Sequence, residues 1–578
     1  MSRRLARIGG RVTYDRHPSV AAGAAALCHV GWPAVAAALG RDAPRCIVVE
    51  AYPGTRLRTL EELARGVGAT RLLLSEDALR PVAEIERLVA PDLGNDPVFG
   101  RLSRLELASF FDPAALQRLR TEADAEPGRV VVAGVGAALV TAGDVLVYAD
   151  LPRWEIQQRQ RCGESGNLGA ANAGALPAEI YKRSYFVDWR VADRHKFALW
   201  NDVDWFLDVS TAASPKLVAA ATIDAALAVA ARRPFRVVPF FDPAPWGGQW
   251  MREVCGLPQE PPNFGWCFDC VPEENGLALA FGDSRFELPA LDLVVREARA
   301  LLGSEIVARY GAEFPIRFDF LEPIGRGNLS VQVHPQRDYM RRNFGLGYTQ
   351  DESYYLLDAD PGAHVHLGVV DGTRPESMIA ALRRSERGEE PFPATHYVNR
   401  FPARRHDHFL IPGGTVPGSG AGSMVLEISS TPYIFTFKLY DWDRPGLDGR
   451  PRPLHIDRGA VNIRFDRDGT FARRELINCL KPLESGPGWR SERTGLHAAE
   501  ILETHRHWFT GLTPHADLET VQVLNLVAGE AAVVESPDGA FAPFEVHYAE
   551  TFIVPAAAGP FTLRPLPRSG EDGEAHAT

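Results

Sequence analysis

Apolar residues follow two different patterns along the chain, and the change comes near residue 235. In the first part, short β-branched runs alternate with Ala-, Leu- and Arg-rich stretches in which apolar residues recur at helical spacing. This pattern predicts strands at Cys46–Tyr52, Arg129–Ala133 and Asp144–Tyr148 and a helix at Pro113–Glu122. Strands that alternate with helices are typical of an α/β domain with a mainly parallel sheet.

From about Pro239 the predicted strands become short and closely spaced, and aromatic residues, Pro and Gly become more frequent. Such strands indicate an antiparallel sandwich or barrel. They are predicted at Ser330–Val333, Ser353–Asp358, His364–Val369, His408–Ile411 and Met424–Ile428. Further strands in Val521–Glu535 and Glu545–Pro555 predict a second barrel, and the apolar spacing in Leu291–Tyr310 predicts a helical insertion.

These patterns predict three domains and a tail. We expect an α/β domain at 1–235 and an all-β domain at 236–455, with the helical insertion at about 286–315. A second β domain is expected at 456–568, followed by a disordered, Gly-, Glu- and Asp-rich tail at 569–578.

Composition narrows the classes of protein to consider. The 578 residues are 45% hydrophobic and 24% charged, which allows several packed domains and excludes general disorder. The formal net charge of -12 argues against nonspecific binding of nucleic acid, which needs a basic face. We expect a cytoplasmic protein without membrane contact, because no apolar run suits a signal peptide or a membrane span. The seven cysteines, spread thinly along the chain, predict free thiols.

Two features of the first domain could contact a phosphate or a metal ion. Gly134–Thr141 follows a predicted strand as a phosphate-binding P-loop would, but Leu139 and Val140 stand where that loop needs Gly and Lys. A structural turn is therefore the better interpretation. Asp150 ends an apolar strand and could bind Mg²⁺ at the carboxyl edge of a sheet. The domain faintly resembles a degenerate nucleotide kinase.

The segment Asn328–Pro335 carries the most informative chemistry. Residues two apart in a strand point to the same face, so Gln332 and His334 can reach one point inside a barrel. Glu352 follows eighteen residues after His334, at the start of an apolar strand. An amide oxygen, an imidazole and a carboxylate suit Zn²⁺ or a similar divalent ion. A lone His or Glu in a strand is more often structural, so spacing alone leaves both interpretations open.

This part of the chain resembles class I mannose-6-phosphate isomerases. Leu329–Pro335 (LSVQVHP) is nearly identical to a signature of that family, and His408–Val416 resembles its Pro-x-Gly-Thr-x-His segment. Further similar segments, in the same order, are Pro245–Met251 (PWGGQWM), Val425–Ile428 (VLEI), Tyr440–Arg444 (YDWDR), Gly449–Leu454 (GRPRPL) and Glu545–Thr562. The resemblance extends from about Pro239 to the end and implies cupin (jelly-roll) folds for the β domains.

The resemblance implies one zinc ion per chain, with Gln332, His334 and Glu352 as three of its four protein ligands. The fourth ligand is a His in the family, whereas this chain has Pro417, whose side chain has no donor atom. Water is the simplest substitute for the missing ligand. Histidines in neighbouring segments that could also replace it are His364, His366, His406 and His408.

The implied reaction interconverts an aldose 6-phosphate and a ketose 6-phosphate through a cis-enediol, with zinc as the Lewis acid. Glu427 aligns with a carboxylate of the family's site and is either the general acid/base or a structural charge. Gln350 stands where the family has a phosphate-binding Lys, and Lys438 replaces an active-site Arg. Arg444 and Arg452 are candidates for contact with the phosphate or for a structural role.

Two functions from different classes stay open. The first is a zinc-dependent aldose-ketose isomerase of sugar phosphates, acting in carbohydrate metabolism and impaired by Pro417. The alternative is a noncatalytic protein that binds or senses a sugar phosphate on the same fold. An active kinase fused to the isomerase is disfavoured, because the P-loop pattern fails.

Overall fold

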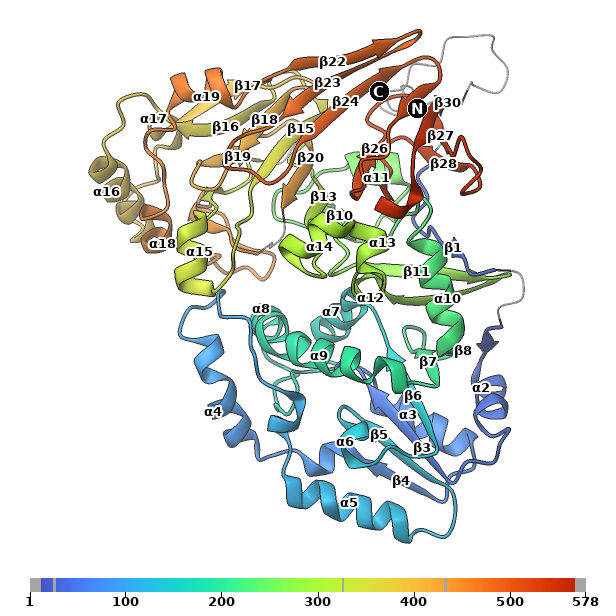
Figure 1. Cartoon of the computed structure of the whole chain (residues 1–578). Coiled ribbons are helices and arrows are strands. Elements are labelled where there is room, and N and C mark those ends of the chain that lie inside the picture. Colours follow the sequence, from blue (N-terminus) through green and yellow to red (C-terminus); the bar gives the residue numbers. More distant parts are fainter. Residues whose placement is uncertain (1–11, 24–26, 325–326, 431–433, 567–578) are drawn as a thin grey trace. The chain divides into compact units, whose positions relative to one another are not determined.

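The chain folds into two units, each built from segments that are not continuous in sequence (Figure 1). The computed structural model describes residues 12–23, 27–324, 327–430 and 434–566. The α/β unit consists of Ser19–Ala230 and Glu273–Arg296, and the β unit consists of Met1–Pro18, Ala231–Pro272 and Glu297–Thr578. The expected tail at 569–578 lies outside the described residues.

The α/β unit is built on a seven-stranded sheet. Its strand order is β2 (His29–Val30), β8 (Lys216–Ala219), β7 (Trp205–Asp208), β6 (Val145–Asp150), β3 (Cys46–Ala51), β5 (Val130–Gly134) and β4 (Arg71–Leu74). The five strands from β7 to β4 are parallel, and β8 and β2 add antiparallel pairs at one edge. Strands β3 and β5 are buried along their whole length, as parallel strands between helical layers should be.

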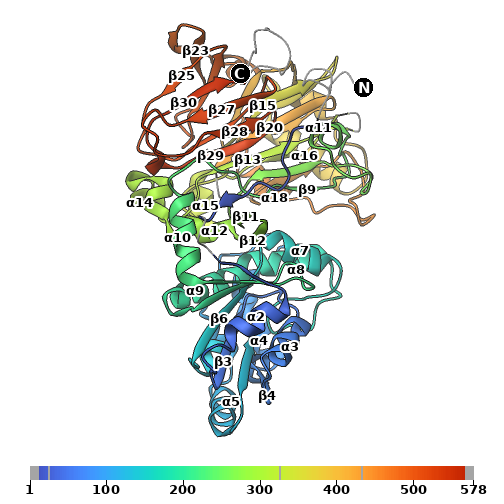
Figure 2. The same cartoon turned by 90° about the vertical axis from the view of Figure 1, so that its right-hand side faces the viewer.

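Helices flank this sheet (Figure 2). They are α2 (Trp32–Leu39), α3 (Leu57–Gly66), α4 (Val82–Leu93), α5 (Pro113–Ala125), α6 (Ala137–Val140), α7 (Arg153–Arg161), α8 (Pro177–Arg183), α9 (Trp189–Leu199) and α10 (Ala220–Ala230). Helix α5 covers the predicted Pro113–Glu122.

The segment Glu273–Arg296 packs with the α/β unit, although the expected boundary at 235 assigns it to the second domain. It forms the hairpin β11 (Gly276–Phe281) and β12 (Ser284–Pro289), joined in parallel by β1 (Val20–Ala21), and then α12 (Ala290–Arg296). Asp292 of α12 accepts hydrogen bonds from buried Lys196 at 2.6 and 2.7 Å, and Lys196 also pairs with Asp150. These charges are stable in the interior only as a paired set, which holds the segment in this unit.

The β unit contains a six-stranded antiparallel sheet. Its strand order is β18 (His408–Ile411), β15 (Glu352–Ala359), β20 (Ser423–Ser430), β13 (Ile316–Leu321), β10 (Trp266–Cys270) and β9 (Phe240–Asp242). Two smaller sheets accompany it: β17 (Val398–Pro402), β16 (His364–Val369) and β19 (Pro417–Ser419), and β14 (Val331–Val333) with β21 (Phe437–Tyr440). One apolar core joins the six-stranded sheet to the sheet of β16 and β17, with Tyr354 and Leu356 from β15 and Val365 and Leu367 from β16.

The remaining strands of the β unit follow after residue 480. They are β22 (Lys481–Gly486), β23 (Trp489–Gly495) and β24 (Thr504–Phe509) in one sheet, β25 (Thr513–His515), β30 (Phe561–Pro565), β27 (Ala531–Glu535) and β28 (Phe544–His547) in a second, and β26 (Gln522–Asn525) with β29 (Thr551–Val554). Phe509, Val534, Phe552 and Phe561 belong to a separate core here.

Short helices complete the β unit. They are α11 (Trp250–Cys255), α13 (Ala298–Leu302), α14 (Ser304–Tyr310), α15 (Arg337–Phe344), α16 (Pro375–Glu386), α17 (Ala394–Tyr397), α18 (Ile456–Ala460) and α19 (Gly469–Glu475). The helical pattern predicted at Leu291–Tyr310 is divided between α12, α13 and α14. Gly303 separates the last two with φ +90, where a side chain would lie 2.2 Å from the Glu519 carbonyl oxygen.

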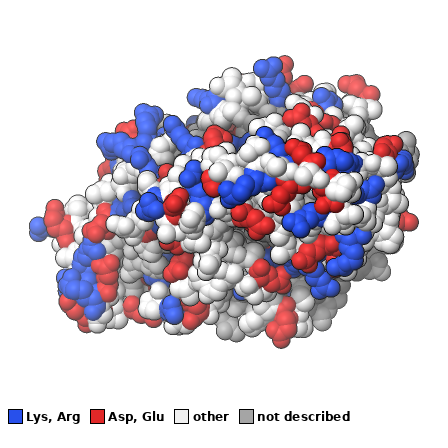
Figure 3. All heavy atoms as spheres, turned by 90° about the horizontal axis from the view of Figure 1, so that it is seen from below, with Lys and Arg blue, Asp and Glu red and all other residues white. Residues whose placement is uncertain are grey.

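No helix within the described ranges is long and apolar enough to cross a membrane. On the face in Figure 3, Lys and Arg are interspersed with Asp and Glu. This mixture differs from the continuous basic face that nucleic acid requires.

A buried charge cluster ties both ends of the β unit together. Arg236 pairs with Glu550 at 2.7 Å and with Asp269 at 3.5 Å, and Asp269 also accepts a hydrogen bond from Tyr14. The cluster joins the segment before the α/β unit to β10 and to the end of β28. Removing the cation would leave two carboxylates buried without it.

We therefore predict that Arg236→Met destabilises the β unit by about 3 kcal/mol, the usual cost of removing one partner of a buried ion pair. Chemical denaturation followed by tryptophan fluorescence would show a lower midpoint. The matched control is Arg474→Met, which removes an exposed pair with Glu475 and should change the midpoint little. Equal effects of the two substitutions would contradict this role for Arg236.

Candidate functional site

Two rows of polar side chains cross the six-stranded sheet. Strand register places Asp319, Glu427 and Tyr354 side by side in one row, and Arg317, Ser429 and Glu352 in the next. All six are buried. Directly opposed residues and residues two apart point to the same side of a sheet, so the six share one face, called here the site face. Phe318, Ile428 and Tyr355 lie between them in sequence and point to the opposite face.

His334 and Glu352 meet on the site face. His334 Nε2 lies 2.9 Å from Glu352 Oε2, and both side chains are almost completely buried. His334 Nδ1 lies 3.3 Å from the Phe435 carbonyl oxygen, to which it can donate only when that nitrogen carries the proton. In this tautomer Nε2 presents its lone pair to the carboxylate. Nε2 and both Glu352 oxygens have no hydrogen-bond partner among the described residues.

A divalent cation fits this arrangement. Ligand atoms about 2.0–2.1 Å from a tetrahedral zinc lie about 3.3 Å apart, close to the observed separation. A carbonyl that fixes the imidazole tautomer is the usual support of a metal-binding His. Gln332, two residues earlier on β14, is buried, and its Oε1 accepts from Ser330 Oγ at 3.1 Å. Within the described ranges no three His, Cys, Asp or Glu side chains form a metal-binding group, so the site depends on the amide of Gln332 as well.

Position 417 faces the same interior. Pro417 on β19 pairs with Leu367 on β16, and Leu367 belongs to the core that contains Tyr354. The ring of Pro417 therefore points inward and offers no donor atom at this position.

The histidines considered as replacements lie on other faces. His364 and His366 alternate with Val365 and Leu367, so they point away from the core, and the His366 ring lies 5.7 Å from that of Trp442. His408 pairs with Tyr355, whose hydroxyl is 2.9 Å from His406 Nδ1. Tyr355 points to the face opposite Glu352. These histidines are therefore not placed on the face of Glu352.

The acids of the site face perturb one another. Burial, together with Asp319 and Glu352, raises the pKa of Glu427 well above its ordinary value, against the influence of Arg317. Burial raises the pKa of Asp319 to about 6, although Arg317 donates to it at 3.0 Å. Gln350 Nε2 donates to Glu427 Oε1 at 3.4 Å, which places the predicted substrate residue beside the predicted acid/base.

The predicted basic residues fall into two groups according to where they lie. Lys438 on β21 is directly opposite Gln332, and burial with a contribution from Arg452 lowers its pKa to about 8. Arg444 donates to Asp441 at 2.9 Å and to the Asn328 carbonyl at 2.6 Å. Arg452 is also bound to Asp441, at 2.5 Å. Lys438 therefore lies next to the predicted ligands, whereas both arginines stabilise the loop after β21.

The candidate residues of the α/β unit are hydrogen-bonded or ion-paired with other residues of the same unit. Glu50 accepts from Gly136 N at 2.6 Å and from Ala138 N at 2.8 Å, so a carboxylate occupies the amides that a P-loop would offer to phosphate. Gly134 has φ +123, and a Cβ there would lie 2.2 Å from Glu76 Oε2. Asp150 is paired with Lys196. Both features have structural partners in place of ligands.

Comparisons with known proteins give two kinds of match, a family model and several named relatives. Residues 31–232 match the family model described as "Domain of unknown function (DUF8485)".

The chain is also similar to proteins named mannose-6-phosphate isomerase.

One such protein, from Streptococcus mutans, is 27% identical over 297 residues, which cover 50% of this chain and 83% of that protein. The "Probable mannose-6-phosphate isomerase GmuF" of Bacillus subtilis is 24% identical over 332 residues, covering 57% and 96%. Among solved structures, the mannose 6-phosphate isomerase of Bacillus subtilis aligns with a TM-score of 0.48 and 19% identity, over 60% of this chain and 98% of that one.

The raised pKa of Asp319 predicts a pH dependence. Its folded-state pKa of about 6 exceeds the ordinary value of 3.8, so the folded chain binds the proton more tightly than the unfolded chain does. Stability is therefore lost as pH rises through this window, by about 3 kcal/mol for a shift of about two units. Asp319→Asn should remove this loss in chelator-treated protein.

Denaturation at pH 4.5 and pH 7.5 would measure it, with exposed Asp517→Asn as the control. The stability of Asp319→Asn relative to wild type should increase toward pH 7.5. A difference that does not change with pH would show that Asp319 carries no such penalty.

Proposed function

We propose that the β unit is a zinc-dependent aldose-ketose isomerase of a sugar phosphate, with metal binding weakened by Pro417. The observation that carries the proposal is the buried pair of His334 Nε2 and Glu352, whose facing atoms have no other partner among the described residues. The names of the relatives and the agreement of the sequence motifs support the same reaction class.

Gln332, His334 and Glu352 would hold the ion, which when bound supplies a Lewis acid that polarises a carbonyl. The rest of the site acts through side chains of this chain. Lys438, beside Gln332, presents a cation to an anionic oxygen of the sugar phosphate. Its lowered pKa of about 8 still leaves most of the population charged at neutral pH.

Glu427 is the proposed proton carrier between C1 and C2. Burial and the neighbouring carboxylates raise the pKa of this carboxyl well above its ordinary value, which favours its protonated form and suits a group that both gives and takes a proton. Gln350 Nε2, at 3.4 Å, orients the carboxyl. Gln350 carries no charge, so less of the phosphate affinity comes from this position than a Lys would provide.

The metal assignment predicts that His334→Ala abolishes bound zinc. The loss of an imidazole from a set of three protein ligands leaves only an amide and a carboxylate. Metal per chain would be measured by elemental analysis after dialysis against a mild chelator. Exposed His396→Ala is the matched control and should keep its metal. Full metal occupancy in His334→Ala would refute the ligand set.

Restoring the fourth ligand is the second test. Pro417 faces the interior, so Pro417→His should raise both zinc affinity and mannose-6-phosphate isomerisation, by about tenfold or more, because even outer partners of a metal are worth about 10 to 100-fold. Pro417→Ala removes the ring without adding a ligand and should raise neither. If every variant bound a sugar phosphate without converting it, the isomerase proposal would be wrong and a noncatalytic sensor would be the better interpretation.

A further inference from the structure

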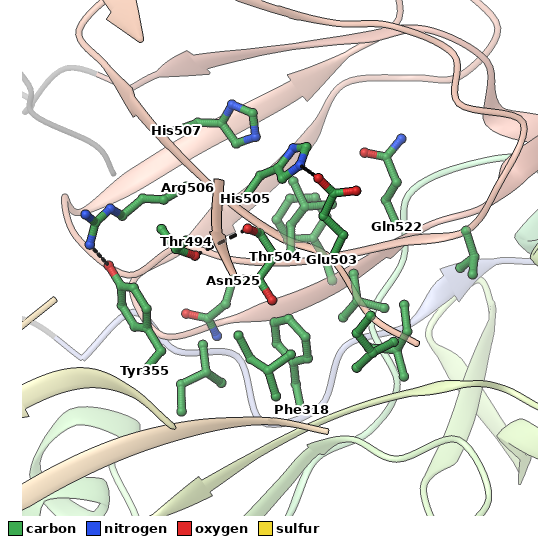
Figure 4. Close-up of a pocket in the computed structure, with 18 of the residues that line it drawn as sticks. Phe318, Tyr355, Thr494, Glu503, Thr504, His505, Arg506, His507, Gln522 and Asn525 are labelled. Carbon is green, nitrogen blue, oxygen red and sulfur yellow. Dashed lines mark hydrogen bonds and ion pairs between the residues drawn. The ribbon is translucent and has the colours of Figure 1, made fainter. Parts of the chain in front are cut away.

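A cavity of about 390 Å³ lies in the β unit on the side of the sheet opposite the site face (Figure 4). One wall is formed by Phe318, Leu426 and Ile428, which alternate in sequence with residues of the site face. The other wall comes from strands after residue 500 and includes Leu524, Phe552 and Leu563. Because β13 and β20 lie between them, the cavity is separate from the candidate metal site.

The size and lining of the cavity are those of a small-molecule site. Its volume falls in the usual range of about 300–1,000 Å³ for ligand pockets, and such pockets are mainly apolar with a few placed polar groups. Protein interiors otherwise pack with few voids larger than a water molecule. An apolar molecule bound there would gain dispersion contacts with this lining.

Polar side chains gather on one side of the cavity. Figure 4 shows Glu503, His505, His507 and Gln522 on the side away from Phe318. This distribution gives the space an apolar part and a polar end, which suits an amphiphilic molecule.

The charges at the polar end are already neutralised. Glu503 pairs with His505 at 3.0 Å and with Arg493 at 3.3 Å, while Arg506 pairs with Glu492 at 2.8 Å. A ligand with an ionic head would therefore find no free counter-charge and would lose hydration without replacement. The head group has to be uncharged.

The amide of Asn525, which lines the cavity, has a fixed orientation. Its Nδ2 donates to the Ala549 carbonyl at 3.1 Å and contacts Thr551 Oγ1 at 2.9 Å, which fixes the orientation of the amide. Its Oδ1 is buried and has no hydrogen-bond partner among the residues that the structure describes. This oxygen has almost no accessible surface, so a ligand in the cavity would contact the rest of the Asn525 side chain and not its acceptor.

We propose that this cavity binds one uncharged, mainly apolar molecule with a small polar head, such as a medium-chain alcohol or an arylamine. The site is independent of the metal ligands and of the isomerase chemistry. Its occupant is distinguished from a sugar phosphate by the absence of charge and by its apolar body.

The test uses the purified full chain and the uncharged fluorescent probe N-phenyl-1-naphthylamine, which has an apolar body and one N–H donor. We expect saturable binding of one probe per chain at pH 8. 1-Decanol should displace it at a concentration at least tenfold lower than decanoate, which has the same chain with a charged head. Binding without saturation, several probes per chain, or equal displacement by decanoate would overturn the proposal.

A variant locates the probe. Leu524→Trp fills the cavity from β26 and should weaken probe binding at least tenfold, while Leu512→Trp, the same change at a residue 55% exposed and outside the cavity, should leave it unaltered. Circular dichroism and thermal unfolding of both variants establish that they fold. Unchanged affinity in a folded Leu524→Trp would place the probe elsewhere. Should that variant not fold, the wild-type stoichiometry and the decanol-decanoate comparison still decide.

Discussion

The burial of three carboxylates on one face of an antiparallel sheet is the constraint on which the β unit depends. Asp319, Glu352 and Glu427 all lie in the interior, and Arg317 reaches Asp319 at 3.0 Å and Glu427 at 3.9 Å. One guanidinium cannot neutralise three buried acids, because an uncompensated charge in the interior costs several kcal/mol. The remaining negative charge must be neutralised by bound protons or by a cation. The raised pKa values of Asp319 and Glu427 describe the first solution, and the pair of His334 and Glu352 provides the place for the second.

The replacement of a ligand by Pro417 acts within this balance. An inward-pointing proline ring extends the apolar core formed with Leu367 and leaves the acids unchanged. In the proposed site the driving force for binding a cation would therefore persist, with three protein ligands in place of four. Catalytic zinc sites commonly have three protein ligands and an open position for water or substrate. Pro417 is thus compatible with catalysis at the proposed site, although the affinity for the metal would be lower.

Several parts of this structure could be predicted from sequence because they are local. β16 and β18 have the bounds that their apolar runs predicted. Arg317 and Asp319 were missed, although they alternate with phenylalanines in Ile316–Leu321. An alternating strand shows two faces without showing which one is buried, and here the charged face is inside.

Other features depend on contacts between distant residues. The segment Glu273–Arg296 has no local property that assigns it to the α/β unit. Its placement follows from the pairing of Asp292 with Lys196, 96 residues earlier. Likewise, the unfilled donor position at 417 was visible in the sequence, but only strand register showed that His364, His366, His406 and His408 point away from it.

The same strands serve two environments, and this fixes their register from both sides. Along β13, Arg317 and Asp319 face the buried acids while Phe318 faces the apolar cavity. Along β20, Glu427 and Ser429 alternate with Leu426 and Ile428 in the same way. A shift of one residue would move the charges into the apolar cavity and the aromatic ring into the metal site. Such a slip is unfavourable in both environments, so the site face and the cavity together stabilise one pairing of the sheet.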